Sequence, residues 1–182
     1  TEMYKEKYGE NIPFECHAEI RNEQVCLNSS SYAVELAKKF NSRLHVFHLS
    51  TADELKLFRN DIPLKEKRIT AEICVHHLWF DKSDYARLGS KIKCNPAIKE
   101  AHHKKALFEA LLDDRLDVIA TDHAPHTIEE KSNKYLKAPS GLPLIQHSLN
   151  LMLDFHQQGK ISLERIIEKM CHAPAICFEV KD

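Results

Sequence analysis

Short apolar segments alternate with longer amphipathic segments along this chain, and this alternation is the strongest constraint on its fold. Consecutive apolar side chains predict buried strands at residues 44–49, 70–75 and 117–122. Apolar residues at helical spacing predict helices over residues 29–40, 50–58, 81–89, 99–114, 141–155 and 162–170. Strands that alternate with helices in this way are typical of βα units on a parallel sheet, so the expected fold class is α/β.

The composition is that of an ordinary globular chain with one sizeable core. The 182 residues are 43% hydrophobic and 29% charged, and the formal net charge is -1. Because the chain has no basic excess and no long apolar run, neither nucleic acid nor a membrane is an expected partner. The 6 cysteines form no CxxC pair, which favours free thiols in a reducing compartment, so we expect a cytoplasmic protein.

Polar and histidine-containing segments follow the expected strands. In parallel α/β sheets the active site lies at the carboxyl ends of the strands. We therefore expect the chemistry at residues 48–51, 76–80, 94–96 and 122–126. The first 25 residues are expected to be irregular. The polar loop over residues 123–141 has a length that is usually associated with function.

The segment ATDHAPH (120–126) carries the strongest chemical signal. Asp122 stands at the end of an expected strand, and His123 and His126 follow it. A carboxylate and imidazole nitrogens in one pocket are a donor set that metal ions use in proteins. The alternative interpretation is a loop in which Asp122 caps the next turn.

The segment HVFHLST (45–51) contains two histidines in an expected strand. Side chains alternate between the two faces of a strand, so His45 and His48 are not expected to share one site. His48 is nearer the carboxyl end and is the candidate ligand, whereas His45 is expected to be structural. A core histidine with satisfied hydrogen bonds is an equally good interpretation of His48.

The remaining histidines and one asparagine are less specific. Strand alternation predicts that one ring of the pair His76 and His77 is packed and the other solvated. Asn95 offers both a donor and an acceptor for an amide or a carboxylate, and it suits a turn before Pro96 equally well. The histidines expected on solvated helix faces are His102, His103 and His147.

Taken in chain order, five segments resemble the dihydroorotase branch of the metal-dependent amidohydrolase superfamily. The segments are HVFHLSTADE (45–54), AEICVHHLWF (71–80), IKCNPAIK (92–99), VIATDHAPHTIEEK (118–131) and APSGLPLIQHSL (138–149). The specific part is ATDHAPH with an upstream NPxxK and a downstream APxG. The resemblance covers about residues 14–178, and HAEIRNE (17–23) resembles the loop between the fifth and sixth barrel strands of such enzymes.

The resemblance implies a (β/α)8 TIM barrel, of which this chain would be roughly the second half. The HxH motif of the family's first strand, the bridging Asp or carboxylated Lys of its fourth and the His of its fifth have no counterpart here, and His17 is expected in a loop. A complete barrel takes about 250 residues. We therefore expect residues 1–182 to form one partial catalytic domain, truncated at both ends and inactive alone.

The resemblance also implies roles for individual residues. His48 would ligate one metal ion. Asp122 would bind another metal ion and act as the general acid/base. The positions that would hold the ring amide and the carboxylate of the substrate are Asn95, His126, Ser140 and Gly141.

The implied activity is that of a zinc-dependent dihydroorotase. Such an enzyme reversibly hydrolyses (S)-dihydroorotate, a small-molecule substrate, to N-carbamoyl-L-aspartate in pyrimidine synthesis. One or two Zn²⁺ ions and a homodimer are expected of the complete enzyme. One alternative is an allantoinase- or hydantoinase-type cyclic amidohydrolase. The other is a non-catalytic, dihydroorotase-like scaffold, against which the presence of both His48 and Asp122 argues.

Overall fold

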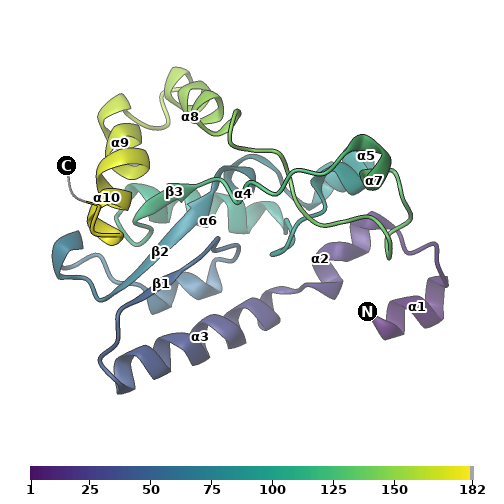
Figure 1. Cartoon of the computed structure of the whole chain (residues 1–182), viewed down its shortest axis with the longest axis horizontal. Helices are drawn as coiled ribbons and strands as arrows, with labels where there is room; N and C mark the ends of the chain where they lie inside the picture. The colour runs from purple at the N-terminus through teal and green to yellow at the C-terminus, as the bar shows by residue number, and fades with distance from the viewer. Residues whose placement is uncertain (181–182) are drawn as a thin grey trace.

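The computed structural model describes residues 1–180, and its centre is a three-stranded parallel sheet in the order β1–β2–β3 (Figure 1). The strands are β1 (Leu44–Val46), β2 (Ile69–Cys74) and β3 (Val118–Ala120). The expected α/β class and parallel sheet are confirmed. A closed barrel is not seen within residues 1–180, and the last two residues of the expected 1–182 domain lie outside the described residues.

Helices flank the sheet, and α1 (Glu2–Tyr8) and α10 (Ala173–Cys177) lie toward opposite ends of the long axis (Figure 1). The α-helices are α1 (Glu2–Tyr8), α2 (His17–Ile20), α3 (Glu23–Lys39), α4 (Val75–Trp79), α5 (Tyr85–Leu88), α6 (Ala101–Leu112), α7 (Ile128–Lys131), α8 (Ser148–Gln157), α9 (Leu163–Ile167) and α10 (Ala173–Cys177). Short 3-10 helices cover Phe14–Cys16, Asp53–Leu57, Leu64–Glu66, Lys82–Asp84 and Gly89–Ile92, and a π-helical turn covers Glu168–His172. Within the described part of the chain, no helix has both the length and the apolarity needed to cross a membrane.

The amino-terminal part of the chain is helical, which corrects the expectation of an irregular stretch over residues 1–25. Helices α1 and α2 lie there, and α3 begins at Glu23 rather than near residue 29. The reason is local, because the Asn22 side chain accepts a hydrogen bond from the Val25 amide at 3.1 Å and caps α3. Lys38 and Lys39 in the last turn face the negative end of the helix dipole.

Three other boundaries differ from the expected ones. The helix predicted over residues 50–58 is a 3-10 helix at Asp53–Leu57. Helix α8 starts at Ser148 rather than at residue 141. The predicted loop at residues 123–141 contains α7, where the Thr127 hydroxyl accepts from the Glu130 amide at 3.2 Å in a capping box.

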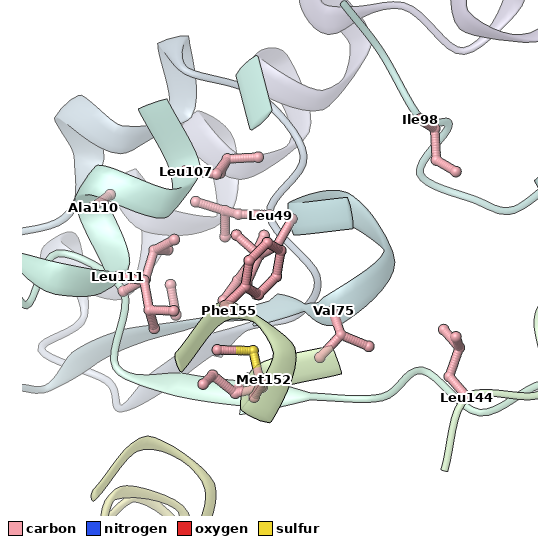
Figure 2. Close-up of a cluster of buried hydrophobic side chains, with 14 of the residues drawn as sticks. Leu49, Val75, Ile98, Leu107, Ala110, Leu111, Leu144, Met152 and Phe155 are labelled. Carbon is pink, nitrogen blue, oxygen red and sulfur yellow. The ribbon is translucent and has the colours of Figure 1, made fainter. Parts of the chain in front are cut away.

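The core lies between the sheet and the helices α4, α6 and α8. Figure 2 shows Met152 and Phe155 of α8 against Leu107 and Leu111 of α6, with Leu49 nearby. All of these side chains are buried. Burying an aliphatic or aromatic side chain contributes about 1.5–3 kcal/mol, so this contact holds α6 and α8 on the sheet.

A buried ion pair ties the amino ends of β2 and β3 together. The Lys67 ammonium lies 2.7 Å from Asp117 Oδ1, and the two side chains are 2% and 3% exposed. The other carboxylate oxygen of Asp117 accepts from the Ala71 amide at 3.0 Å, and Lys67 also donates to the Asp114 carbonyl at 2.6 Å. These bonds fix β3 beside β2 at the edge opposite the strands' carboxyl ends.

We predict that Lys67→Met strongly destabilises the protein. The substitution leaves the Asp117 carboxylate buried without its cation, which typically costs about 3–5 kcal/mol. Urea denaturation measures the change, with Lys65→Met as the matched control because Lys65 is exposed. Equal stability of the two variants would mean that the pair does not hold the sheet.

Candidate active site

Two candidate ligands follow the carboxyl ends of strands with an unusual backbone conformation. His48 comes shortly after β1 with a φ of 40°, and Asp122 comes shortly after β3 with a φ of 46°. Side-chain-bearing residues rarely adopt this left-handed region, and residues held there cluster at functional sites. Asn41 and Asp114 at the opposite edge share this conformation, so it is the position of His48 and Asp122 after the carboxyl ends of strands that identifies this edge as the candidate active site.

His48 lies beside a cavity of about 560 Å³ that is also lined by His45 and Asn95. The expectation that His45 and His48 do not share one site is wrong, because both residues line this cavity. Strand alternation does not extend to His48, since β1 ends at Val46. The Nδ1 atom of His48 is buried and has no hydrogen-bond partner among the described residues. A buried nitrogen without a partner is free to bind a ligand or an ion.

His45 has a structural role, as expected. Its ring nitrogens lie 2.7 Å from Thr70 Oγ1 and 3.1 Å from Glu72 Oε2, both on β2. Burial lowers the pKa of His45, but hydrogen bonds of the ring to Cys177 and to the Glu72 carboxylate outweigh that effect and raise the pKa to about 9. His45 is therefore a cation that ties β1 to β2 at neutral pH.

Asp122 lies close to the segment that carries Asn95. Burial raises the pKa of the neighbouring Cys94 thiol to about 12, and the negative charge of Asp122 adds to this shift. The same charge contributes to the raised pKa of Cys74 at the end of β2, which is also mainly due to burial. The carboxylate of Asp122 is therefore close enough to interact electrostatically with Cys74, at the end of β2, and with Cys94, which precedes Asn95.

The segment before Asn95 is anchored by side chains that the sequence analysis did not identify. His17 is buried in α2 rather than placed in a loop, and its Nε2 atom lies 2.7 Å from the Cys94 carbonyl oxygen. Its Nδ1 atom lies 2.7 Å from the Tyr135 hydroxyl. Burial lowers the pKa of His17 to about 4, so the ring is neutral. Asn95 itself is exposed at the cavity.

The functional loop over residues 123–141 folds back onto the same segment. The buried Lys131 ammonium donates to the carbonyl oxygens of Lys93, Pro139 and Gly141, each at 3.0 Å. The Gly141 amide donates to the Lys93 carbonyl at 2.9 Å. Gly141 has a φ of 145°, and a Cβ atom there would lie 2.7 Å from the Cβ of Ala124, so only glycine fits.

The other expected substrate contacts lie along this loop. His126 is partly exposed, and its Nδ1 atom lies 3.4 Å from Glu130 Oε2. Ser140 is half-buried next to Gly141. The structure thus brings His48 and Asn95 to one cavity. The expected site residues that do not line it are Asp122, His126, Ser140 and Gly141.

Two expectations about histidine pairs are wrong. His76 and His77 do not continue β2 but begin α4, and both rings are buried with centroids 4.2 Å apart. His103 is buried rather than solvated, because its Nδ1 accepts from the Ala52 amide at 3.0 Å and its Nε2 lies 2.8 Å from Glu23. The histidines that are exposed as expected are His102 and His147.

Solved structures with a similar fold are cyclic amidohydrolases. The L-hydantoinase (dihydropyrimidinase) of Arthrobacter aurescens has a TM-score of 0.76 and 29% identity, over 84% of this chain and 34% of that one. A D-hydantoinase from Thermus sp. has a TM-score of 0.82 and 21% identity, over 96% and 40%. A dihydroorotase from Saccharomyces cerevisiae in complex with 5-fluoroorotic acid has a TM-score of 0.72 and 23% identity, over 81% and 42%. The fold is therefore part of the cyclic amidohydrolase fold.

Curated proteins with similar sequences are dihydroorotases. Dihydroorotases from Carboxydothermus hydrogenoformans and Bacillus subtilis are 38% and 37% identical over 143 and 146 residues, which cover 78% and 80% of this chain. The dihydroorotase of Methanosphaera stadtmanae is 34% identical over 149 residues. No protein-family model matches the chain. The chain is a relative of the dihydroorotases, as the motifs indicated, and spans about a third of the length of these relatives.

We predict that Lys131→Met loosens the loop over residues 123–141. The substitution removes the only side-chain donor shared by the carbonyls of Lys93, Pro139 and Gly141 within the described residues. Amide hydrogen exchange should therefore accelerate in this loop and at Gly141, while exchange in β2 stays slow. Lys134→Met is the matched control, because Lys134 is exposed in the same loop. Unchanged exchange in Lys131→Met would show that the loop is held by other contacts.

The pH dependence of stability gives a second readout for Lys131. Burial lowers its pKa from the usual 10.5 to about 8 in the folded protein, so the unfolded chain binds more protons between these pH values. The free energy of unfolding should therefore gain a rising contribution from pH 8 to 10.5. That contribution should be absent in Lys131→Met, as measured by urea titrations of both proteins across this range.

Proposed function

We propose that this chain carries part of the active site of a dihydroorotase, which reversibly hydrolyses (S)-dihydroorotate to N-carbamoyl-L-aspartate. The observation that carries the proposal is the arrangement at one edge of the sheet. His48 and Asp122 follow the carboxyl ends of two parallel strands, and Asn95 lies at the cavity beside His48. The 31–38% identity to proteins named dihydroorotase supports this substrate over other cyclic amides. A homodimer and a cytoplasmic location stay predictions.

The donor set at this edge fits a Zn²⁺ ion in part. An imidazole nitrogen and a carboxylate are common zinc ligands, and the Nδ1 atom of His48 is buried without a partner. Catalytic zinc sites usually have three protein ligands, so further ligands complete the site in the proposed enzyme. When bound, the metal would lower the pKa of a water molecule and polarise the ring carbonyl of the substrate.

Asp122 is proposed to move the proton of the reaction. When water adds to the ring carbonyl and the amide bond breaks, the departing ring nitrogen needs a proton. A carboxylate at the mouth of the sheet is placed to take a proton from the attacking water and to return it to that nitrogen. The half-buried position of Asp122, shortly after β3, supports this role.

The substrate is proposed to lie between Asn95 and the loop over residues 123–141. Asn95 can donate to and accept from the ring amide. His126 and the Ser140–Gly141 backbone would hold the substrate carboxylate. Lys131 supports this arrangement, because it binds the Gly141 carbonyl and the Lys93 carbonyl and so joins the two segments.

A hydantoinase- or allantoinase-type activity is the second candidate. It is favoured by the similarity in fold to proteins named hydantoinase, one of which is 29% identical. Turnover of dihydroorotate, hydantoin and allantoin by the complete enzyme separates the two candidates. Turnover of hydantoin without turnover of dihydroorotate would replace the proposed substrate, and no turnover of any would leave the scaffold interpretation.

We predict that Asp122→Asn in the complete enzyme lowers kcat for dihydroorotate by about 10²-fold or more, the usual range for a lost general acid/base. Asparagine has a similar shape but does not take and return a proton. The KM should change much less, because Asn95 and His126 remain. Asp61→Asn is the control, since Asp61 is exposed and paired with Arg59. A normal kcat with a full metal complement would make Asp122 structural and end the proposed mechanism.

We predict that His126→Ala raises the KM for dihydroorotate and leaves the metal content unchanged. The loss of one charge-assisted hydrogen bond costs about 1.5–3 kcal/mol, which corresponds to roughly a tenfold to hundredfold change. His147→Ala is the control, because His147 is exposed on the surface. Steady-state kinetics and elemental analysis measure the two quantities, and zinc loss in His126→Ala would show that His126 is a ligand instead.

A further inference from the structure

Three buried side chains near the candidate site bring metal-ligating atoms together. His76 and His77 come from α4, and Cys94 comes from the segment after the Gly89–Ile92 helix. One ligating atom from each of the three residues lies within 4.8 Å of the others. His76 and Cys94 are 0% exposed and His77 is 4% exposed, so the group is closed off from solvent.

Of the four imidazole nitrogens of this group, only His77 Nε2 has a partner among the described residues, the Pro96 carbonyl oxygen at 3.2 Å. Both ring nitrogens of His76 and the Nδ1 atom of His77 are buried without a hydrogen-bond partner among the described residues. An unsatisfied buried polar group costs about 1–3 kcal/mol. Both ring nitrogens of His17 and of His103, which are also buried, have partners. Outside this group, the buried side-chain atoms without a partner among the described residues are His48 Nδ1 and the Tyr85 hydroxyl, so His76 is the histidine that lacks a partner at both nitrogens.

The protonation states of the group suit metal binding. Burial lowers the pKa of His76 to about 3 and the pKa of His77 well below 6.5, so both rings are neutral and each has a free lone pair. The Cys94 thiol is protonated and donates to the Pro96 carbonyl at 3.2 Å. A metal ion binds the thiolate, so it would displace this proton to solvent.

We propose that His76, His77 and Cys94 form a zinc-binding site that uses neither of the candidate ligands His48 and Asp122. Two imidazole nitrogens and one thiolate are a donor set that Zn²⁺ accepts, and bound Zn²⁺ would give the unpaired nitrogens of His76 and His77 a partner. One proton leaves Cys94 for each ion bound, which leaves a net charge of +1 near the carboxylate of Asp122. This site does not depend on the proposed dihydroorotase activity.

Titration of the metal-free protein with Co²⁺ tests the site, because a thiolate bound to Co²⁺ gives a near-ultraviolet charge-transfer band that nitrogen and oxygen ligands do not give. The band should appear in the wild type and disappear in Cys94→Ser. It should persist in Cys26→Ser, the matched control, since Cys26 lines the cavity beside His48 but is not in the group. His76→Gln should weaken Co²⁺ binding at least tenfold.

The double variant His48→Ala/Asp122→Asn separates this site from the proposed catalytic one. In the complete enzyme this variant should lose turnover and keep the charge-transfer band, whereas Cys94→Ser should lose the band. Zinc-edge X-ray absorption of the wild type needs no variant, and it should show a sulfur neighbour at about 2.3 Å. A band that survives in Cys94→Ser, or only nitrogen and oxygen neighbours at saturating zinc, overturns the proposal whatever the enzyme turns over.

Discussion

The parallel pairing of β1, β2 and β3 is the constraint on which the rest of the structure depends. It directs all three carboxyl ends to one edge, so side chains far apart in sequence meet there. The pairing continues beyond β1, because the Leu49 amide donates to the Glu72 carbonyl at 2.9 Å. His48 lies between the end of β1 and this bond, and the bond holds it beside β2 in its left-handed conformation.

Buried lysines stabilise the loops at the edge of the sheet, because they donate hydrogen bonds to loop carbonyl groups that the strands do not bond. Carbonyl groups that enter the interior need donors, and each ammonium supplies three. At the carboxyl edge Lys131 binds three carbonyls and Lys93 binds those of Tyr135 and Ala138. Burial lowers the pKa of both lysines, which is the free-energy cost of this arrangement. The long loop over residues 123–141 is thereby held against the segment that carries Asn95.

The sequence was sufficient to predict the sheet and the edge that carries the candidate site. The apolar run of β2 and the position of Asp122 after a buried strand are local signals, and both appear in the structure. The orientation of individual side chains was not predictable from these local signals. His76 and His77 were read with strand alternation, but α4 begins at Val75 and turns both rings inward. The pattern of a strand does not show at which residue the strand ends.

Residues whose partners are distant in sequence were missed for a related reason. His17 bonds to Tyr135 and to the Cys94 carbonyl, and Lys131 bonds to the Lys93 carbonyl. None of these contacts leaves a periodicity, since a charged side chain in a polar loop has the same local pattern whether it is buried or solvated. The family resemblance identified the segments that contain Asn95 and Gly141, but not the side chains that hold them.

The charge of Asp122 links the two metal sites proposed at this edge. Its carboxylate helps to raise the pKa of Cys94, so it favours the neutral thiol when no cation is present. The same negative charge attracts a divalent cation to the group of His76, His77 and Cys94. An ion bound there would therefore be stabilised by the carboxylate of Asp122. The charge of Asp122 and the occupancy of the buried group would thus be coupled by electrostatics, even though Asp122 is not a ligand of that group.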